Sequence, residues 1–167
     1  MLSKGDENTW DTMLQRYISE SNAQEKAKLL RGLAWIDQPW VIRQFLRLAK
    51  NETIVRSQDF MTCLRYIGQN PIGLPIVWEF MRNEWPYLVD RFSLNDRYLG
   101  RMPKYLSYTF SSQLRMDELE NFFKKYPEAG AGKRAREQAR ENIQNNINWL
   151  KTHQDTIHQW FSRNLVY

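Results

Sequence analysis

The sequence predicts an all-α fold in which antiparallel helical hairpins stack as an α-solenoid. Apolar residues recur at steps of three and four along almost the whole chain, as they do on one face of an amphipathic helix. Prolines and short polar turns divide this pattern into roughly ten short segments. No segment of the sequence shows the alternation of apolar and polar residues that is typical of a strand.

Helix signals begin close to the N-terminus. The apolar stripe from Trp10 to Ile18 predicts the first helix. Asn22 is placed to cap the second helix, which has to end before Pro39. A third helix is expected to follow, striped by apolar residues from position 41 to position 49.

The next signals come from capping residues and prolines. Ser57 is placed to cap a fourth helix, which the turn at residues 68–71 stops. Pro75 opens a helix that continues through Trp85, because proline is tolerated in a first turn. A further break gives a short piece that ends near Phe92. The remaining helices are predicted at about residues 98–109, 113–126, 133–151 and 154–165.

The predicted helices come in pairs, and the pairs resemble one another. Residues 30–34 read Leu-Arg-Gly-Leu-Ala and residues 64–68 read Leu-Arg-Tyr-Ile-Gly, while residues 45–47 and 80–82 read Phe-Leu-Arg and Phe-Met-Arg. The period of about 35 residues is in the range of helical repeats. Such hairpins bury their apolar faces on their neighbours and form a curved array. A four-helix bundle is the alternative, but it has too few helices for this pattern.

The net charge of +5 and the pI near 9.4 raise the question of a nucleic-acid partner. The densest basic stretch contains Lys133, Arg134, Arg136 and Arg140, but Glu137 and Glu141 alternate with these residues at helical spacing. That mixture favours pairing within a helix on a solvated face. We therefore expect no nucleic-acid partner, and a basic adaptor, whose affinity would collapse with salt, remains the weakest alternative.

A search for catalytic groups finds no constellation that could act. His153 and His158 are five residues apart, whereas the HExxH zinc motif needs a step of four, so both are predicted to be surface residues. Cys63 lies in an apolar stripe and is predicted to be a buried core thiol. No catalytic residue, metal ligand or cofactor site is therefore predicted in this chain.

Asn51 begins the sequence Asn-Glu-Thr, which matches the acceptor pattern for N-glycosylation in a predicted surface loop. Such a short pattern also occurs by chance. It favours an extracytoplasmic location without establishing one. No apolar run in the sequence approaches the eighteen residues that a membrane-spanning helix requires.

The segment from residue 93 to residue 101 invites a functional interpretation because it is polar and holds Arg97 and Arg101. A guanidinium group beside a cavity can bind a carboxylate through two parallel hydrogen bonds. The alternative is that Asp96 caps the following helix and both arginines are simply solvated. The residues alone favour this second interpretation.

Several stretches of the sequence nevertheless resemble the C-terminal domain of the M1 family of zinc aminopeptidases. They are Asn-Ala-Gln-Glu-Lys at 22–26, Leu-Leu-Arg-Gly-Leu-Ala at 29–34, Arg-Ser-Gln-Asp at 56–59, Val-Trp-Glu-Phe at 77–80, and the tail from Tyr-Pro-Glu-Ala-Gly-Ala-Gly at 126–132 to Trp-Phe at 160–161. Residues 87–91, 94–101 and 125–127 most resemble the members that remove N-terminal glutamate, and the members that remove neutral residues come next.

The resemblance implies that residues 1–167 are part of a helical-repeat domain similar to armadillo and HEAT repeats. In the family this domain forms a bowl over the active site of a separate, thermolysin-like domain. The HExxH motif with its downstream Glu and the GxMEN motif that grips the free amine are absent from these residues. The chain alone is therefore expected not to be an enzyme, and zinc is expected in the missing catalytic domain.

The resemblance also assigns a role to Arg97, whose position matches an arginine that reaches toward the substrate in glutamyl-type members; Arg101 is a weaker candidate. It implies partners as well: the catalytic domain of the same polypeptide, peptide substrates, and a second copy in a homodimer. The implied location is the extracellular side of the plasma membrane, with an anchor outside this sequence. A stand-alone helical-repeat scaffold for a protein partner is the alternative function, and a preceding zinc-motif domain would exclude it.

Overall fold

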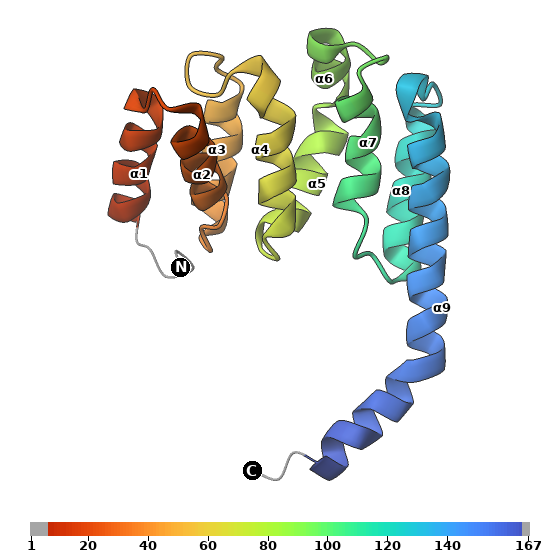
Figure 1. Cartoon of the computed structure of the whole chain (residues 1–167). Helices are drawn as coiled ribbons and strands as arrows, with labels where there is room; N and C mark the ends of the chain where they lie inside the picture. Colours follow the sequence, from red (N-terminus) through yellow and green to blue (C-terminus); the bar gives the residue numbers. More distant parts are fainter. Residues whose placement is uncertain (1–6, 165–167) are drawn as a thin grey trace. The chain divides into compact units, whose positions relative to one another are not determined.

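The computed structural model describes residues 7–164 and contains helices and turns, with no strand in this range. The prediction of an all-α chain is confirmed. The chain divides into two compact units, Met1–Ser93 and Leu94–Tyr167, called unit 1 and unit 2 below. Figure 1 shows the helices of each.

Unit 1 is a stack of helical hairpins. Its helices are α1 (Glu7–Ser19), α2 (Ala23–Leu33), α3 (Pro39–Ala49), α4 (Ser57–Gln69), α5 (Gly73–Asn83) and α6 (Trp85–Phe92). Helix α2 packs on α4, α3 packs on α5, and α4 and α5 form a tight hairpin. Equivalent helices of successive hairpins therefore lie against each other, which is the arrangement of an α-solenoid.

The sequence repeat accounts for the core of this stack. Leu30 and Leu33 of α2 are buried, as are Leu64 and Ile67 at the corresponding positions of α4. Burial of these apolar side chains against the neighbouring hairpin supplies the main stabilisation, because each is removed almost completely from water. The predicted period therefore corresponds to one structural hairpin.

Asn70 fixes the register between successive hairpins. Its side chain is buried, and its amide nitrogen donates to the carbonyl oxygens of Ala34, at 3.1 Å, and Ile36, at 2.7 Å, in the turn after α2. Its Oδ1 accepts from the backbone N–H of Ile72 at 3.0 Å. A buried amide with these partners is satisfied, so it ties the end of α4 to the preceding hairpin.

Two helix boundaries in unit 1 differ from those predicted. Ser57 does not cap α4 but is its first residue, and its Oγ donates to Glu52 Oε1 at 2.7 Å instead. Helix α5 ends at Asn83, and Trp85 begins α6 with Pro86 in its first turn. Proline opens a helix here rather than only interrupting one. The predicted cap at Asn22 is confirmed, because its side chain accepts from two backbone N–H groups at the start of α2.

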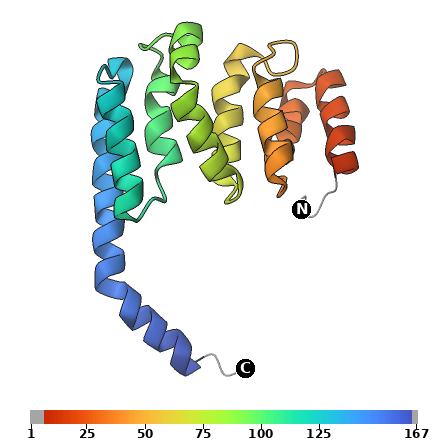
Figure 2. The same cartoon turned by 180° about the vertical axis from the view of Figure 1, so that it is seen from behind.

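Unit 2 contains α7 (Arg97–Leu106), α8 (Gln113–Lys125), the 3₁₀ turn η1 (Gly130–Gly132) and α9 (Lys133–Asn164). Helix α9 packs on α7 and α8 through Ala135, Ala139 and Ile143. Figure 2 shows that it continues past the ends of both. Its residues 151–164 are all exposed.

The prediction of two helices at 133–151 and 154–165 is wrong. The structure has a single helix of 32 residues, and position 165 lies outside the described residues. Thr152, His153 and Gln154 lack the fixed φ of proline and the freedom of glycine, so nothing at this point has to end the helix. None of the helices in the described range is long and apolar enough to cross a membrane.

Candidate functional site

A hollow lined by basic side chains lies in unit 2, and we call it the basic hollow. It has a volume of about 640 Å³ and is lined by Arg97, Arg101, Lys104 and Tyr105 of α7, Ala131 of η1, and Arg134, Ala135 and Gln138 of α9. The structure therefore brings together the two arginines that the sequence indicated, and adds Lys104 and Arg134 to them.

Helical spacing explains why these side chains share one surface. Arg97, Arg101 and Lys104 are separated by four and three residues, so they lie on one face of α7. Arg134 and Gln138 are likewise four residues apart on α9. The opposite side of α7 carries buried apolar residues, including Leu99, Met102 and Leu106.

Two glycines bring these elements close together. A Cβ atom built on Gly100 would lie 2.7 Å from the backbone nitrogen of Gly132, and one built on Gly132 would lie 2.6 Å from the carbonyl oxygen of Gly100. No side chain fits between these backbones, so only glycine allows the contact. The contact places the start of α9 beside α7, and it therefore sets Arg134 against the same hollow as Arg97 and Arg101.

The charges in the basic hollow are not neutralised by neighbours. Among the described residues, Arg97, Arg101 and Arg134 have no carboxylate within ion-pair distance, and Lys104 Nζ donates to Gln138 Oε1 at 2.8 Å. Helix α9 carries no acidic residue in its first turn, and the carboxylate at the start of α7, that of Asp96, is engaged in capping that helix. The hollow therefore has a positive potential that favours anions.

Asp96 caps the helix that follows it, as the second interpretation of residues 93–101 predicted. Its Oδ1 accepts from the backbone N–H of Leu99 at 2.7 Å, so it caps α7. The two interpretations are compatible in the structure, because the capped helix is what directs Arg97 and Arg101 to one face. Both arginines are exposed.

The prediction that the basic stretch of α9 is a solvated, internally paired face is wrong for two of its residues. Arg136 is 5% exposed, and it donates to the carbonyl oxygens of Tyr126, at 2.6 Å, and Glu128, at 2.9 Å. Arg140 pairs with Glu120 of α8 at 2.5 Å rather than with a neighbour on its own helix. Packing against α8 offers these side chains partners that spacing along one helix cannot reveal.

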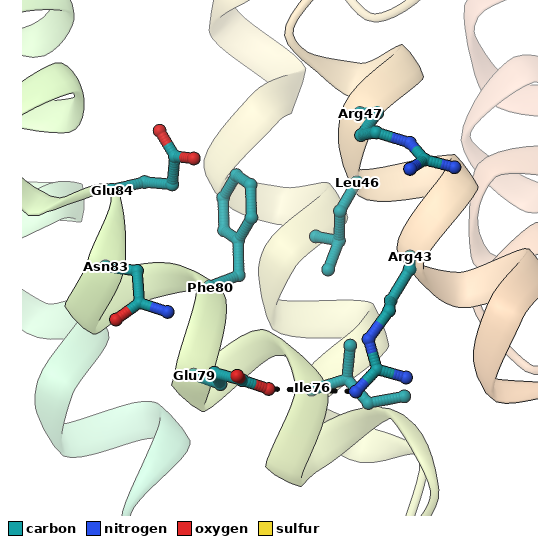
Figure 3. Close-up of a pocket in the computed structure, with 8 residues that line it drawn as sticks. All are labelled: Arg43, Leu46, Arg47, Ile76, Glu79, Phe80, Asn83 and Glu84. Atoms are coloured by element: carbon teal, nitrogen blue, oxygen red, sulfur yellow. Dashed lines mark ion pairs between the residues drawn. The ribbon is translucent and has the colours of Figure 1, made fainter.

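A second hollow, of about 230 Å³, lies between α3 and α5 in unit 1, as Figure 3 shows. Leu46, Ile76 and Phe80 provide apolar wall, and Arg43 lies 3.7 Å from Glu79 across it. Both signs of charge are present and pair with each other here. This hollow therefore lacks the single-sign field of the basic hollow.

Cys63 and the histidines lie where the sequence predicted. Cys63 is fully buried, and burial raises the pKa of its thiol, which keeps it protonated and unreactive. His153 and His158 are exposed on α9. In the range 7–164, no three His, Cys, Asp or Glu side chains gather in a way that could hold a metal ion.

Asn51 lies in an exposed loop between α3 and α4, as predicted. Its Oδ1 accepts from the backbone N–H of Thr53 at 3.0 Å and from the Thr53 hydroxyl at 2.8 Å. Arg91 of α6 holds this loop by donating to the Lys50 carbonyl oxygen at 3.2 Å and by pairing with Glu52 at 3.1 Å. The loop is therefore fixed at its base while the acceptor side chain faces solvent.

The sequence did not indicate the other polar lining residues, which are Lys104, Tyr105, Arg134 and Gln138. The spacing of Lys104 from Arg101 could have placed it on the same helical face. Arg134 and Gln138 could not have been found this way, because the contact between Gly100 and Gly132 that positions them joins segments distant in sequence.

The chain belongs to the family of ERAP1-like C-terminal domains, whose family model matches residues 1–145. It is similar to aminopeptidase A of Gloydius brevicauda, with 45% identity over 160 residues, and to human glutamyl aminopeptidase, with 42% identity over 161 residues. Aminopeptidase Ey of Gallus gallus is more distant, at 28% identity over 162 residues.

These three matches cover 96% of this chain but 17% of each relative, so the chain spans about a sixth of their length. The predicted resemblance to the C-terminal domain of aminopeptidases, and to the glutamyl type among them, is confirmed.

Proposed function

We propose that this chain is the non-catalytic C-terminal domain of a zinc-dependent M1 aminopeptidase of the glutamyl or neutral type, which removes N-terminal residues from peptides. The family membership and the names of the relatives support this proposal. Zinc binding and hydrolysis belong, on this proposal, to the remainder of a longer polypeptide.

Within that enzyme the domain covers the active-site chamber and contributes Arg97 to the binding of substrate. The observation that carries this role is the basic hollow, in which Arg97 is exposed and has no carboxylate partner among the described residues. A free guanidinium can form two charge-assisted hydrogen bonds with the carboxylate of an acidic substrate. Arg101, one turn further along α7, is the weaker candidate for the same role.

Replacement of Arg97 in the full-length enzyme tests this role. We expect Arg97→Ala to lower kcat/KM for a glutamyl substrate about tenfold, because a charge-assisted pair of this kind contributes on the order of 1–2 kcal/mol. Activity toward an alanyl substrate should stay close to that of the unmodified enzyme, because alanine offers no side-chain carboxylate.

Lys133→Ala is the matched control, since Lys133 is an exposed cation of the same unit that does not line the basic hollow. It should leave both substrates unaffected. Equal kinetic constants for Arg97→Ala and the unmodified enzyme on both substrates would show that Arg97 does not bind substrate.

The division of labour between this chain and the rest of the enzyme is tested with glutamyl and alanyl chromogenic amides. The full-length enzyme should hydrolyse them, while the 167-residue chain should not, with or without added zinc. Zinc-dependent turnover by the purified chain would contradict the proposal. The alternative, a stand-alone scaffold, would gain support if no zinc-motif domain precedes this segment in the natural transcript.

We also propose that the enzyme acts on the extracellular side of the plasma membrane, is glycosylated at Asn51 and forms homodimers. The exposed position of Asn51 supports the modification. Enzyme from a secretory host should lose mass on treatment with an N-glycosidase, and Asn51→Gln should reduce that loss by one glycan. An unchanged loss would show that Asn51 carries none.

A further inference from the structure

The polar side chains that line the basic hollow are almost all donors. Arg97, Arg101, Lys104 and Arg134 can donate but cannot accept a hydrogen bond. Gln138 has one acceptor, Oε1, and Lys104 occupies it at 2.8 Å. A ligand that satisfies this wall must supply acceptors and negative charge.

The hollow holds more positive charge than one carboxylate needs. The proposed function uses Arg97 alone, and a single guanidinium fork is sufficient to bind one carboxylate in bidentate fashion. Lys104 and Arg134 have no role in it and Arg101 is only an alternative to Arg97, although all three line the same 640 Å³ hollow. Holding like charges together in this way costs energy that a multiply charged anion would offset.

The surroundings of the hollow favour a short anion over a long one. The next cations along α9 are already occupied: Arg136 binds backbone carbonyl oxygens and Arg140 pairs with Glu120. The positive surface therefore does not continue along the helix as a track, which a nucleic-acid backbone would require. Tyr105 adds a 39% exposed ring to the wall, which suits contact with a peptide.

We propose that Arg101, Lys104 and Arg134 form a second carboxylate site beside Arg97, so that an acidic peptide is held by at least two of its carboxylates at once. This inference rests on the proposed function and names its substrate class: peptides with an acidic group beyond the N-terminal residue. Arg134 is the key residue, because the Gly100–Gly132 contact brings it from a different helix.

A binding experiment on the 167-residue chain tests the inference without any enzyme activity. The probes are tetraglutamate and tetraglutamine, titrated into labelled chain and followed by two-dimensional NMR. We expect tetraglutamate to bind and to shift amide signals in residues 97–105 and 131–138, while tetraglutamine does not. Arg101→Gln and Arg134→Gln should each raise the Kd for tetraglutamate about three- to tenfold.

Lys133→Gln is the control, because it removes the same charge from the residue next to Arg134 without touching the hollow. It should change the Kd by less than about twofold, since the lost charge is exposed and screened. Each variant's own spectrum shows whether it is folded. Arg101→Lys and Arg134→Lys, which keep the charge but not the fork, should weaken binding less than the glutamine variants do.

Four results would overturn the inference: no binding of tetraglutamate, equal binding of tetraglutamine, equal weakening by Lys133→Gln and Arg134→Gln, or tighter binding of a short DNA duplex through the same residues. The outcome is separable from that of the proposed function. If tetraglutamate binds in the hollow while Arg97→Ala leaves the enzyme's kinetics unchanged, the hollow is a carboxylate site but not part of the substrate path. If the kinetics change but tetraglutamate does not bind, only the second site is wrong.

Discussion

Arg134 and Arg136 lie two residues apart on α9, but their surroundings differ. Arg134 is exposed and lines the basic hollow, whereas Arg136 is buried against the end of α8. The guanidinium of Arg136 lies 4.7 Å from the centre of the Phe123 ring and donates to backbone carbonyl oxygens after α8. Burial and the nearby Arg140 lower its pKa. Arg136 therefore stabilises the C-terminal end of a helix rather than a ligand.

Truncation of Arg136 should destabilise the chain strongly. Arg136→Leu removes the donor to the partly buried carbonyl oxygens of residues 126–128 and the contact with Phe123, and we expect it to lower the free energy of unfolding by about 2–4 kcal/mol. Arg134→Leu, the exposed neighbour, should change it by less than about 0.5 kcal/mol. Urea unfolding followed by circular dichroism measures both, and equal effects of the two variants would contradict the buried role.

Tyr17 links stability to alkaline pH. It is 1% exposed, and its hydroxyl has no hydrogen-bond partner among the described residues. Burial, together with the neighbouring Cys63 and Asp59, raises the pKa of Tyr17 to about 12. The pKa of this side chain in the unfolded chain is about 10, so above that pH the unfolded chain lowers its free energy by ionising while the folded chain stays neutral. The stability of the folded state is therefore unaffected by this group below about pH 10 and falls as pH rises from about 10 to about 12.

The free energy of unfolding should therefore fall between about pH 10 and pH 12, and Tyr17→Phe should remove this part of the decline. At neutral pH the free energy of unfolding of the variant should equal that of the parent or exceed it by up to about 1 kcal/mol. The reason is that the substitution removes a buried hydroxyl without a partner. Tyr98→Phe, at a residue that is 67% exposed, should keep the decline. Identical pH profiles for Tyr17→Phe and the parent would refute the assignment.

At the scale of elements, the close contact of α7 with η1 requires glycine at position 100, although glycine is a poor helix former. Alanine is a better helix former than glycine by about 1 kcal/mol, so propensity alone predicts that Gly100→Ala stabilises α7. The added Cβ would instead lie 2.7 Å from the backbone nitrogen of Gly132. The two backbones would have to move apart, since neither is a flexible side chain that could yield.

We expect Gly100→Ala to lower the free energy of unfolding by about 1–3 kcal/mol. Gly132→Ala should act similarly. The double variant should lower the free energy of unfolding by less than the sum of the two single effects, because either substitution alone already forces the two backbones apart. A urea titration of the three variants tests this. A stabilised Gly100→Ala would mean that the backbones are not in contact.

The helical hairpins of unit 1 are the elements that could be predicted best from the sequence. The pairing of α4 with α5, and the packing of α2 on α4 and of α3 on α5, follow from apolar spacing and a repeated sequence. The boundary between α5 and α6 was placed too late because Pro86 can either stop a helix or open one. The single helix α9 was divided in two although nothing in its sequence forces an end.

On the scale of the whole molecule, the far end of α9 carries several exposed aromatic side chains. Trp149, Trp160 and Phe161 are 53%, 59% and 48% exposed, and Ile157 lies on the same face at helical spacing. Aromatic side chains in water on one face of a helix are typical of an interface. This face supports the proposed homodimer.

The 167-residue chain should accordingly self-associate, and the double variant Trp160→Ser and Phe161→Ser should shift it toward the monomer. Sedimentation equilibrium over a range of concentrations measures the dissociation constant, which we expect to rise about tenfold or more, given that each large aromatic buries substantial apolar area. Asp155→Ser is the control, because Asp155 is exposed on the opposite face of α9. A parent chain that is monomeric at every concentration would exclude this interface.

The sequence by itself determined the fold class, the pairing of helices in unit 1 and the membership of an aminopeptidase domain family. These properties depend on the spacing of apolar residues, on prolines and caps, and on stretches of identity, all of which can be read along one chain. It also indicated Arg97 and Arg101, because they stand four residues apart in a polar segment.

Only the tertiary structure decided which basic residues act together. Arg134, Arg136 and Arg140 are equally basic in sequence, yet one lines the hollow, one binds backbone carbonyl oxygens and one pairs with α8. These differences arise from contacts between elements: Gly100 against Gly132 places Arg134 beside the hollow, and packing against α8 gives Arg136 and Arg140 their partners. Charge can be counted from a sequence, but whether it is free to bind a ligand depends on what the fold places beside it.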